Sequence, residues 1–231
     1  MYLFSFFKFL ISFLYSWLKG VRSIKAKCPL TPHTVIVIKD HTMVSQNFLT
    51  AFSYLLINEG TTLSTDYNDP GNWTSGIVGQ GNLLGSKFGI SASSYPNLDI
   101  PNLTQAQAAD IYYKNYWQAI NGDYLPLPLA WAVFDFGVNS GIGTSAKILQ
   151  GIVGAYQDGD IGPMSLQAIN NYINSEGLYN LCLLLNSKRM VFMSGLAVFG
   201  SYPEGLSKRV LATMAVTSYL LYLEGLIPPK V

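Results

Sequence analysis

The spacing of apolar residues changes abruptly at Gly60. Residues 48–56 place apolar side chains at helical spacing, and this helix is predicted to end at Glu59. Residues 61–91 are instead rich in glycine, asparagine, aspartate, serine and threonine, with Asp69-Pro70-Gly71 as a turn signal. Short alternating apolar segments in this stretch predict a small β lobe. The chain must therefore fold as a helix that passes directly into a turn-rich lobe.

The remainder of the body has helical patterns. Ser45 is a suitable N-cap for the first helix, and residues 104–107 form a capping box that opens a helix to about residue 120. Residues 127–138 are apolar nearly all round, which is typical of a central buried helix. Further helices are predicted over residues 144–156, 163–173, 175–198 and 206–224. The expected fold class is α+β and mainly α, a helical body with one small β lobe.

Composition excludes several function classes. The histidines, His33 and His41, both precede the helical body, so that body holds neither a Ser-His-Asp triad nor a histidine-rich zinc site. All acidic residues follow residue 39, which makes the body mildly acidic and unsuited to nucleic acid. No phosphate-binding or dinucleotide motif occurs, and we expect neither a cofactor nor a metal. Carboxylates remain as the main candidates for chemistry.

The N-terminal stretch is apolar and aromatic over residues 2–18, interrupted by Lys8 and followed by basic residues up to Lys27. Its length is marginal for crossing a bilayer. In a cleaved signal peptide the basic residues precede the apolar run, whereas here most of them follow it. We expect a membrane anchor or an interfacial helix, which would place the protein at a membrane. The alternative is an apolar arm that packs on a protein partner.

Glu59 is the first candidate for catalysis. It lies at the C-terminal end of its helix, where the helix dipole and apolar neighbours both favour the protonated carboxyl. A carboxyl that is protonated near neutral pH can act as a general acid. Asp66, Asp69 and Thr74 follow within the turn-rich segment and supply a possible second carboxylate and a hydroxyl.

Five motifs then occur in a fixed order along residues 45–215. They are Asn58-Glu59-Gly60, Asp69-Pro70-Gly71 with Thr74, Ile111-Tyr112-Tyr113 with Tyr116-Trp117, the segment from Ala132 to Gly141, and Asp158 to Pro163 with Ser165-Leu166. Together they resemble glycoside hydrolase family 108, the lysozyme-like N-acetylmuramidases common among phage endolysins. Thr61 and Asn72 depart from the family pattern, which has glycine at both positions.

The resemblance implies a lysozyme-like body and a peptidoglycan hydrolase that cleaves the β-1,4 bond between N-acetylmuramic acid and N-acetylglucosamine. It implies Glu59 as the acid, Asp69 as the group that stabilises positive charge or orients water, and Thr74 as a residue that positions water. Asp66 could replace Asp69 as the second carboxylate. The candidate sugar contacts are Asp66, Trp73, Tyr112, Tyr116, Trp117 and Asn139. For the aromatic residues among them, packing in the core is the competing interpretation.

The expected domain order combines this resemblance, which covers about residues 45–215, with the apolar N-terminal stretch, which lies outside it. An anchor-like helix with a basic flank (1–27) and a linker (28–44) precede a catalytic domain (45–156). A helical, peptidoglycan-binding-like segment (157–231) is expected to pack on that domain. The expected partners are bacterial peptidoglycan, a membrane through residues 2–18, and virion proteins. The expected location is the host cell envelope or a virion, consistent with a viral enzyme of lysis or host penetration.

Two alternatives remain open at the level of sequence. The altered glycine motifs allow a peptidoglycan-binding or virion structural protein that keeps the fold without catalysis. A lytic transglycosylase, in which Glu59 acts alone, is the other. Whether a hydrolase would invert or retain configuration depends on the separation of its carboxyl groups, which the sequence does not contain.

Overall fold

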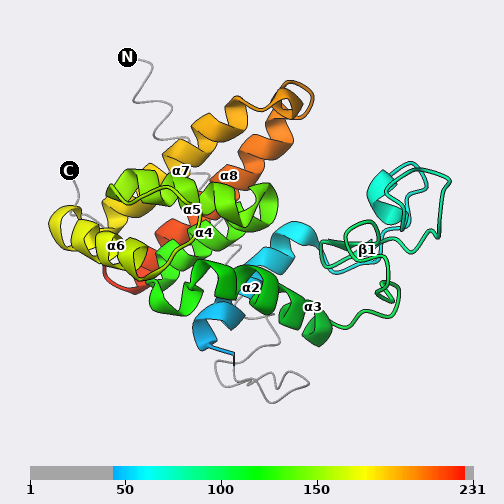
Figure 1. Ribbon diagram of the computed structural model, residues 1–231, viewed down its shortest axis with the longest axis horizontal. Helices are drawn as coiled ribbons and strands as arrows, with labels where there is room; N and C mark the ends of the chain where they lie inside the picture. The colour runs from blue at the N-terminus through cyan, green and yellow to red at the C-terminus, as the bar shows by residue number, and fades with distance from the viewer. Residues whose placement is uncertain (1–43, 227–231) are drawn as a thin grey trace. The chain divides into compact units, whose positions relative to one another are not determined.

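A computed structural model describes residues 44–226 of the chain. The chain divides into two compact units, residues 1–36 and 37–231, and all described residues belong to the second. The predicted anchor, its basic flank and most of the linker lie outside the described residues. Figure 1 shows the helices, which are α2 (Gln46–Glu59), α3 (Gln105–Tyr112), α4 (Leu127–Ser140), α5 (Ile142–Val153), α6 (Pro163–Glu176), α7 (Leu178–Ser194) and α8 (Pro203–Leu223).

The boundaries of α2 and α3 are set by the capping residues that the sequence predicts. The Ser45 hydroxyl accepts a hydrogen bond from the Phe48 amide at 3.2 Å, which satisfies one of the unpaired amides at the start of α2. Gly60 ends α2 with a φ of 78°, a left-handed conformation that glycine adopts without steric cost. Thr104 and Gln107 form the predicted capping box of α3.

The helix predicted to run from Thr104 to about Ile120 changes its winding on the way. After α3 the chain forms a π-helical turn (Tyr113–Trp117) and then a 3-10 turn, η3 (Gln118–Ile120). Asn121 then adopts a positive φ of 50° and ends the run. Local spacing predicts a helix but does not reveal these changes between wider π and tighter 3-10 winding.

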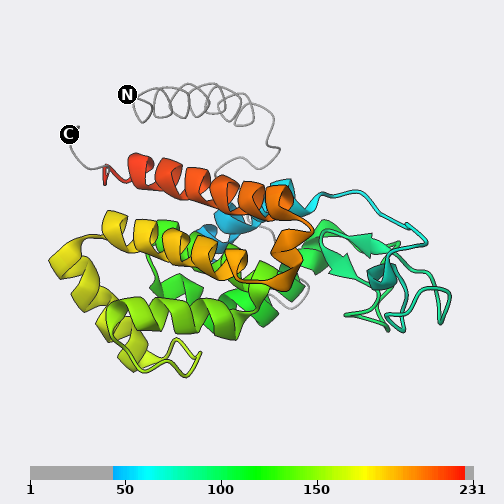
Figure 2. The same cartoon turned by 90° about the horizontal axis from the view of Figure 1, so that it is seen from above.

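Helix α4 forms the centre of the body. It packs against α2, α5, α7 and α8, and its side chains from Pro128 to Gly137 are buried, as its uniformly apolar sequence predicts. The indole nitrogen of Trp131 donates a hydrogen bond to the Thr213 carbonyl at 3.2 Å, which joins α4 to α8. Figure 2 shows α7 and α8 running side by side along the body. The helices after residue 157 therefore share a core with those before it.

The turn-rich segment forms a small lobe that extends from the end of α2 (Figure 1). Its sheet consists of β1 (Ser86–Lys87) and β2 (Ile90–Ser91), antiparallel, with Ser86 opposite Ser91. Isolated bridges join Ser64 to Ser86 and Trp73 to Leu83. The fold class predicted from the sequence, mainly α with a small β lobe, is confirmed. The strands are short because glycine and turn residues interrupt the ladder.

Buried polar side chains hold this lobe together. Asn72 is fully buried, and its amide nitrogen donates to the Asp66 carbonyl at 3.0 Å. The indole nitrogen of Trp73 donates to the Tyr67 carbonyl at 2.8 Å. These bonds replace the long ladders that a larger sheet would supply.

Among residues 44–226, no helix combines the length and the apolar composition that crossing a bilayer requires.

Candidate active site

The carboxylate of Glu59 lies where α2 ends and the lobe begins. Its Oε1 atom is 2.7 Å from Nη2 of Arg209, which α8 contributes from 150 positions later in the chain. The Glu59 side chain is 21% exposed, so it remains reachable from solvent. An ion pair at this distance holds the carboxylate in one orientation. The sequence placed Glu59 at the end of its helix, and the structure adds a guanidinium from a distant helix beside it.

Arg209 is held from its other side by Asp135, a fully buried residue of α4. Its Nε and Nη2 atoms donate to Asp135 Oδ1 at 3.1 and 2.9 Å. Asp135 Oδ2 accepts from Arg189 at 2.8 Å and from the Thr213 hydroxyl at 2.6 Å. The side chain of Asn58, the residue before Glu59, donates to Asp135 Oδ1 at 3.3 Å. Glu59, Asp135, Arg189 and Arg209 thus form one charge-balanced cluster, called here the acid–arginine cluster.

The charges of this cluster stabilise one another. Burial alone would raise the pKa of Asp135, but Arg209, Arg189 and the hydrogen bond from Thr213 outweigh it and lower that pKa. Burial alone would lower the pKa of Arg209, but the Asp135 and Glu59 carboxylates outweigh it and raise that pKa. Through these bonds Asp135 joins α4 to α7 and α8.

Tyr112 joins the helical body to the lobe beside Glu59. Its hydroxyl donates to the Phe88 carbonyl at 3.0 Å, and its ring packs against Tyr116 with centroids 5.4 Å apart. Burial, followed by the nearby Glu59 carboxylate, raises the pKa of Tyr112. Tyr112 and Trp117 are 2% and 0% exposed, so neither ring has a free face for a sugar. Their place is in the aromatic core, whereas Tyr116 is only half-buried and borders the site.

Gly89 lets the lobe approach Glu59 closely. It has a φ of 76°, and a Cβ atom placed on it would lie 2.6 Å from the Tyr112 hydroxyl and 2.9 Å from Glu59 Oε2. We therefore expect Gly89→Ala to cost about 1–3 kcal/mol of unfolding free energy through overpacking, and to lower activity by displacing Glu59. Gly205→Ala is the control, because nothing lies within 4 Å of that position. Equal urea unfolding midpoints for both variants would contradict this prediction.

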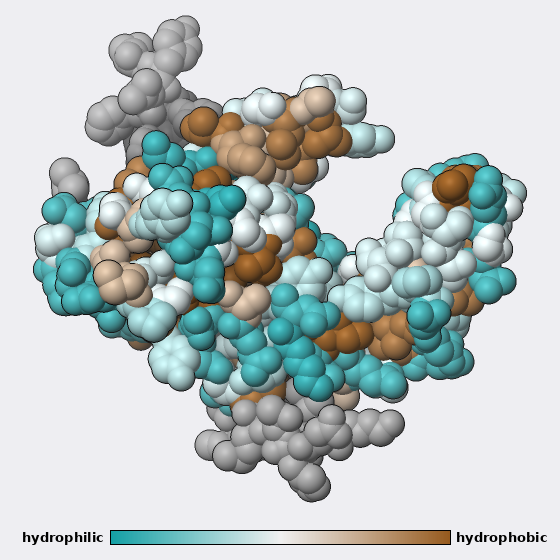
Figure 3. Space-filling model, viewed as in Figure 1, coloured by the Kyte–Doolittle hydropathy of each residue, from teal (hydrophilic) through white to brown (hydrophobic). Residues whose placement is uncertain are grey.

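The remaining predicted catalytic residues lie in the lobe. Asp69 Oδ1 accepts from the Gly71 amide at 2.8 Å, and Asp66 Oδ1 accepts from the Asn68 amide at 3.0 Å. Thr74 Oγ1 accepts from the Asn82 amide at 2.9 Å. These bonds are local. Within residues 44–226 none of them connects Asp66, Asp69 or Thr74 to Glu59. Figure 3 shows an open hollow between the lobe and the turn that joins α7 to α8.

The other candidate sugar contacts are placed differently. Trp73 is 8% exposed, and its ring meets that of the exposed Tyr67 edge-on at a centroid distance of 5.1 Å. It therefore packs within the lobe. Asn139 is exposed near the end of α4, where its side-chain oxygen accepts from the Ser140 hydroxyl at 3.2 Å. In the described part of the chain, no cluster of three or more histidine, cysteine, aspartate or glutamate side chains could hold a metal ion.

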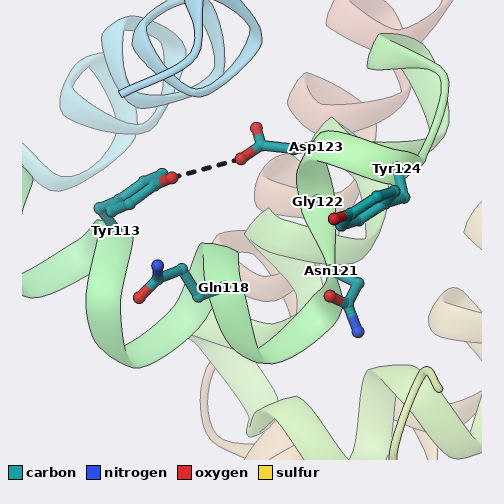
Figure 4. A pocket seen from close by; sticks show the side chains of 6 residues that line it. All are labelled: Tyr113, Gln118, Asn121, Gly122, Asp123 and Tyr124. Atoms are coloured by element: carbon teal, nitrogen blue, oxygen red, sulfur yellow. Dashed lines mark hydrogen bonds between the residues drawn. The ribbon is translucent and has the colours of Figure 1, made fainter. Parts of the chain in front are cut away.

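A cavity of about 310 Å³ lies elsewhere, lined by Tyr113, Gln118, Asn121, Gly122, Asp123 and Tyr124 (Figure 4). Asp123 binds the hydroxyl of Ser45, the N-cap of α2, and accepts from the Trp117 indole at 2.7 Å. The cavity is therefore at the start of α2, whereas Glu59 is at its end, roughly 20 Å away for a helix of this length. We assign the candidate active site from the carboxylates and not from this cavity.

Sequence reasoning missed Arg189 and Arg209 as parts of the site. Both lie in helices with many apolar neighbours, where an arginine can be buried only if it is paired with a carboxylate. That requirement was a usable signal, but it does not identify the partner. Asp135, the buried acid of α4, becomes that partner only once α4, α7 and α8 pack together.

Comparisons with known proteins find a matching family and a similar fold. Residues 52–141 match the model of a family described as glycosyl hydrolase 108. The fold is similar to that of Brucella abortus SagA, with a TM-score of 0.61 and 26% identity, covering 75% of this chain and 94% of that chain. No curated protein matched. The peptidoglycan-binding-like segment predicted for residues 157–231 lies outside the family match and stays a prediction. The resemblance read from the motifs is thus confirmed by the match of residues 52–141 to glycosyl hydrolase family 108.

Proposed function

We propose that this protein is an N-acetylmuramidase that hydrolyses the β-1,4 bond between N-acetylmuramic acid and N-acetylglucosamine in peptidoglycan. The observation that carries the proposal is Glu59, a partly exposed carboxylate at the base of the lobe, held in one orientation by Arg209. The family match supports a glycosidase, and the lobe carries Asp66 and Asp69 as candidates for the second carboxylate. Glycoside hydrolysis requires one carboxyl group that protonates the leaving oxygen and a second group that stabilises the developing positive charge or activates water.

In this proposal Glu59 takes a proton from solvent and donates it to the glycosidic oxygen as the carbon–oxygen bond breaks. The anomeric carbon develops positive charge, which Asp69 of the lobe stabilises or to which it directs a water molecule. Water adds its hydroxyl to that carbon, and its remaining proton passes to a carboxylate or to solvent. Thr74, on the same lobe, positions the water. Asp66 is the alternative second carboxylate.

Product analysis on purified peptidoglycan tests this proposal. The full chain is incubated with the polymer, and soluble fragments are reduced with borohydride and identified by mass spectrometry. A muramidase leaves reducible N-acetylmuramic acid ends. Ends with a 1,6-anhydro ring would overturn hydrolysis in favour of a transglycosylase. Binding to the polymer without any released fragment would instead identify a wall-binding protein.

The location of the enzyme rests on the sequence alone. We propose that residues 2–18 and their basic flank hold the catalytic body at a membrane, in keeping with a viral enzyme of lysis or host penetration. Flotation of the full-length protein with anionic liposomes, compared with a chain that begins at residue 44, tests this. Equal flotation of the two chains would contradict it.

A further inference from the structure

We propose that the turn between α7 and α8 forms a second wall of the active site, on which Tyr202 binds a sugar ring of the glycan strand. The proposal rests on the proposed function, because the glycan strand is the substrate in both. The wall consists of residues 196–202 and is called here the α8 wall. It follows the stretch matched by the family, which ends at residue 141.

The α8 wall is apolar and open to solvent. It contains a 3-10 turn, η5 (Ala197–Gly200), in which Val198 is 46% exposed, and it ends at Tyr202, which is 67% exposed. A Cβ atom placed on Gly200 would meet nothing within 4 Å. Figure 3 shows hydrophobic residues over the turn that joins α7 to α8, beside the hollow that separates this turn from the lobe. Exposed apolar surface beside a hollow is typical of ligand-binding grooves.

Tyr202 has a fixed backbone although its side chain is exposed. Its amide donates to the Val198 carbonyl at 3.0 Å, and its carbonyl accepts from the Leu206 amide at 3.2 Å. It is the residue before α8, but its side chain makes no capping hydrogen bond, so the ring is not needed to start the helix. A tyrosine ring has only two side-chain dihedrals to order, so on a fixed backbone it binds a ligand at low entropic cost.

The period of α8 places Tyr202 on the side of the helix that carries Arg209. The two residues are seven positions apart, which is nearly two full turns or about 10 Å along the helix. Arg209 contacts Glu59, and one turn later Thr213 donates to Asp135 of α4. The orange start of α8 lies toward the lobe in Figure 2. The stripe of α8 that packs on the body therefore continues past Glu59 to the exposed Tyr202.

The charges near the α8 wall favour an uncharged ligand. Within residues 195–209 the charged side chains are Glu204, Lys208 and Arg209. Glu204 and Lys208 pair with each other at 2.6 Å, and Arg209 is already paired with two carboxylates. The peptide stems of peptidoglycan carry free carboxylates, which cationic side chains bind best. A sugar ring instead presents uncharged C–H groups that pack on the face of an aromatic ring, so Tyr202 fits the glycan and not its peptide stem.

Binding of chitotetraose, an uncharged tetramer of N-acetylglucosamine without peptide stems, tests this proposal. Every full-length chain carries Glu59→Gln, so the glycan stays intact, and isothermal titration calorimetry measures the affinity. We expect Tyr202→Ala to weaken binding by about 3- to 10-fold, the range of one aromatic contact. Tyr202→Phe should keep the affinity, because the ring remains.

Tyr156→Ala is the matched control for this substitution. Tyr156 is 85% exposed and lies between α5 and α6, away from α8 and the lobe. We expect the control to bind chitotetraose like the parent chain. Equal affinities of Tyr202→Ala and Tyr156→Ala would overturn the proposal, and so would a parent chain that does not bind chitotetraose.

Kinetics on purified peptidoglycan, with Glu59 present, separates glycan binding from a structural role. Tyr202→Ala should raise the half-saturating concentration of peptidoglycan about 3- to 10-fold and change kcat by less than about twofold. Its urea unfolding midpoint should match that of wild type, because the side chain is exposed. Tyr202→Phe should restore the half-saturating concentration. A loss confined to kcat would overturn the proposal.

Failure of this proposal can be told apart from failure of the proposed function. If Tyr202→Ala binds and hydrolyses like wild type while Glu59→Gln is inactive, the α8 wall is not a glycan site and the hydrolase remains. If chitotetraose binding depends on Tyr202 but Glu59→Gln still releases reducible ends, the assigned acid is wrong and the wall remains. Weaker flotation of Tyr202→Ala with anionic liposomes, at unchanged chitotetraose affinity, would make the wall a membrane contact and overturn the proposal.

Discussion

Glu59→Gln is expected to lower the rate of peptidoglycan hydrolysis by about 10²–10⁴-fold, the usual contribution of a general acid. Glutamine has nearly the same shape, and its amide oxygen can still accept from Arg209. The variant should therefore fold normally and bind the polymer. Only the transferable proton is lost. Release of reducible ends from purified peptidoglycan, followed over time, measures the effect.

The chain contains a close structural control for this substitution. Glu176 ends α6 before Gly177, just as Glu59 ends α2 before Gly60, so both carboxyls lie at the negative end of a helix dipole. Glu176→Gln removes the same charge from the same local setting, away from Arg209. We expect it to keep wild-type activity. Equal losses in both variants would mean that helix-end charge, and not the active site, explains the effect.

The largest expected loss of stability comes from Asp135→Asn. This substitution keeps the volume of the side chain but leaves Arg189, which is 1% exposed, without its only ion-pair partner among residues 44–226. An uncompensated buried charge costs about 3–5 kcal/mol. Urea unfolding followed by tryptophan fluorescence measures this cost. Glu204→Gln removes one charge from an exposed pair with Lys208 and should leave the unfolding midpoint unchanged.

The stability difference between wild type and Asp135→Asn should also depend on pH. Because the pKa of Asp135 is lowered in the folded protein, its charge stabilises the fold above the ordinary value of 3.8. That contribution is lost as pH falls below 3.8 through the lowered folded value. Asparagine does not titrate, so the stability difference between wild type and Asp135→Asn should narrow in this acidic window. A constant difference from pH 7 down to pH 2 would contradict the assigned role of Asp135.

The helical body and the lobe were predictable because their signals are local. A serine or capping box opens α2 and α3, glycine ends α2, and an all-apolar sequence marks α4 as central. These features act over a few residues, where backbone hydrogen bonding and side-chain period decide the structure. The burial of Tyr112 and Trp117 was harder to predict, since aromatic residues at helical spacing are compatible with either a core or a binding surface.

The three glutamate–glycine pairs at helix ends show where local information stops. Glu59-Gly60, Glu176-Gly177 and Glu224-Gly225 each lie at the C-terminal end of a helix, in nearly the same local sequence setting. The motifs around Glu59 singled it out as the candidate acid. Its ion pair with Arg209 arises only because α8 packs across α4 and carries a guanidinium to the end of α2. Charge pairing across distant helices depends on their packing, and that packing sets the electrostatic environment of Glu59.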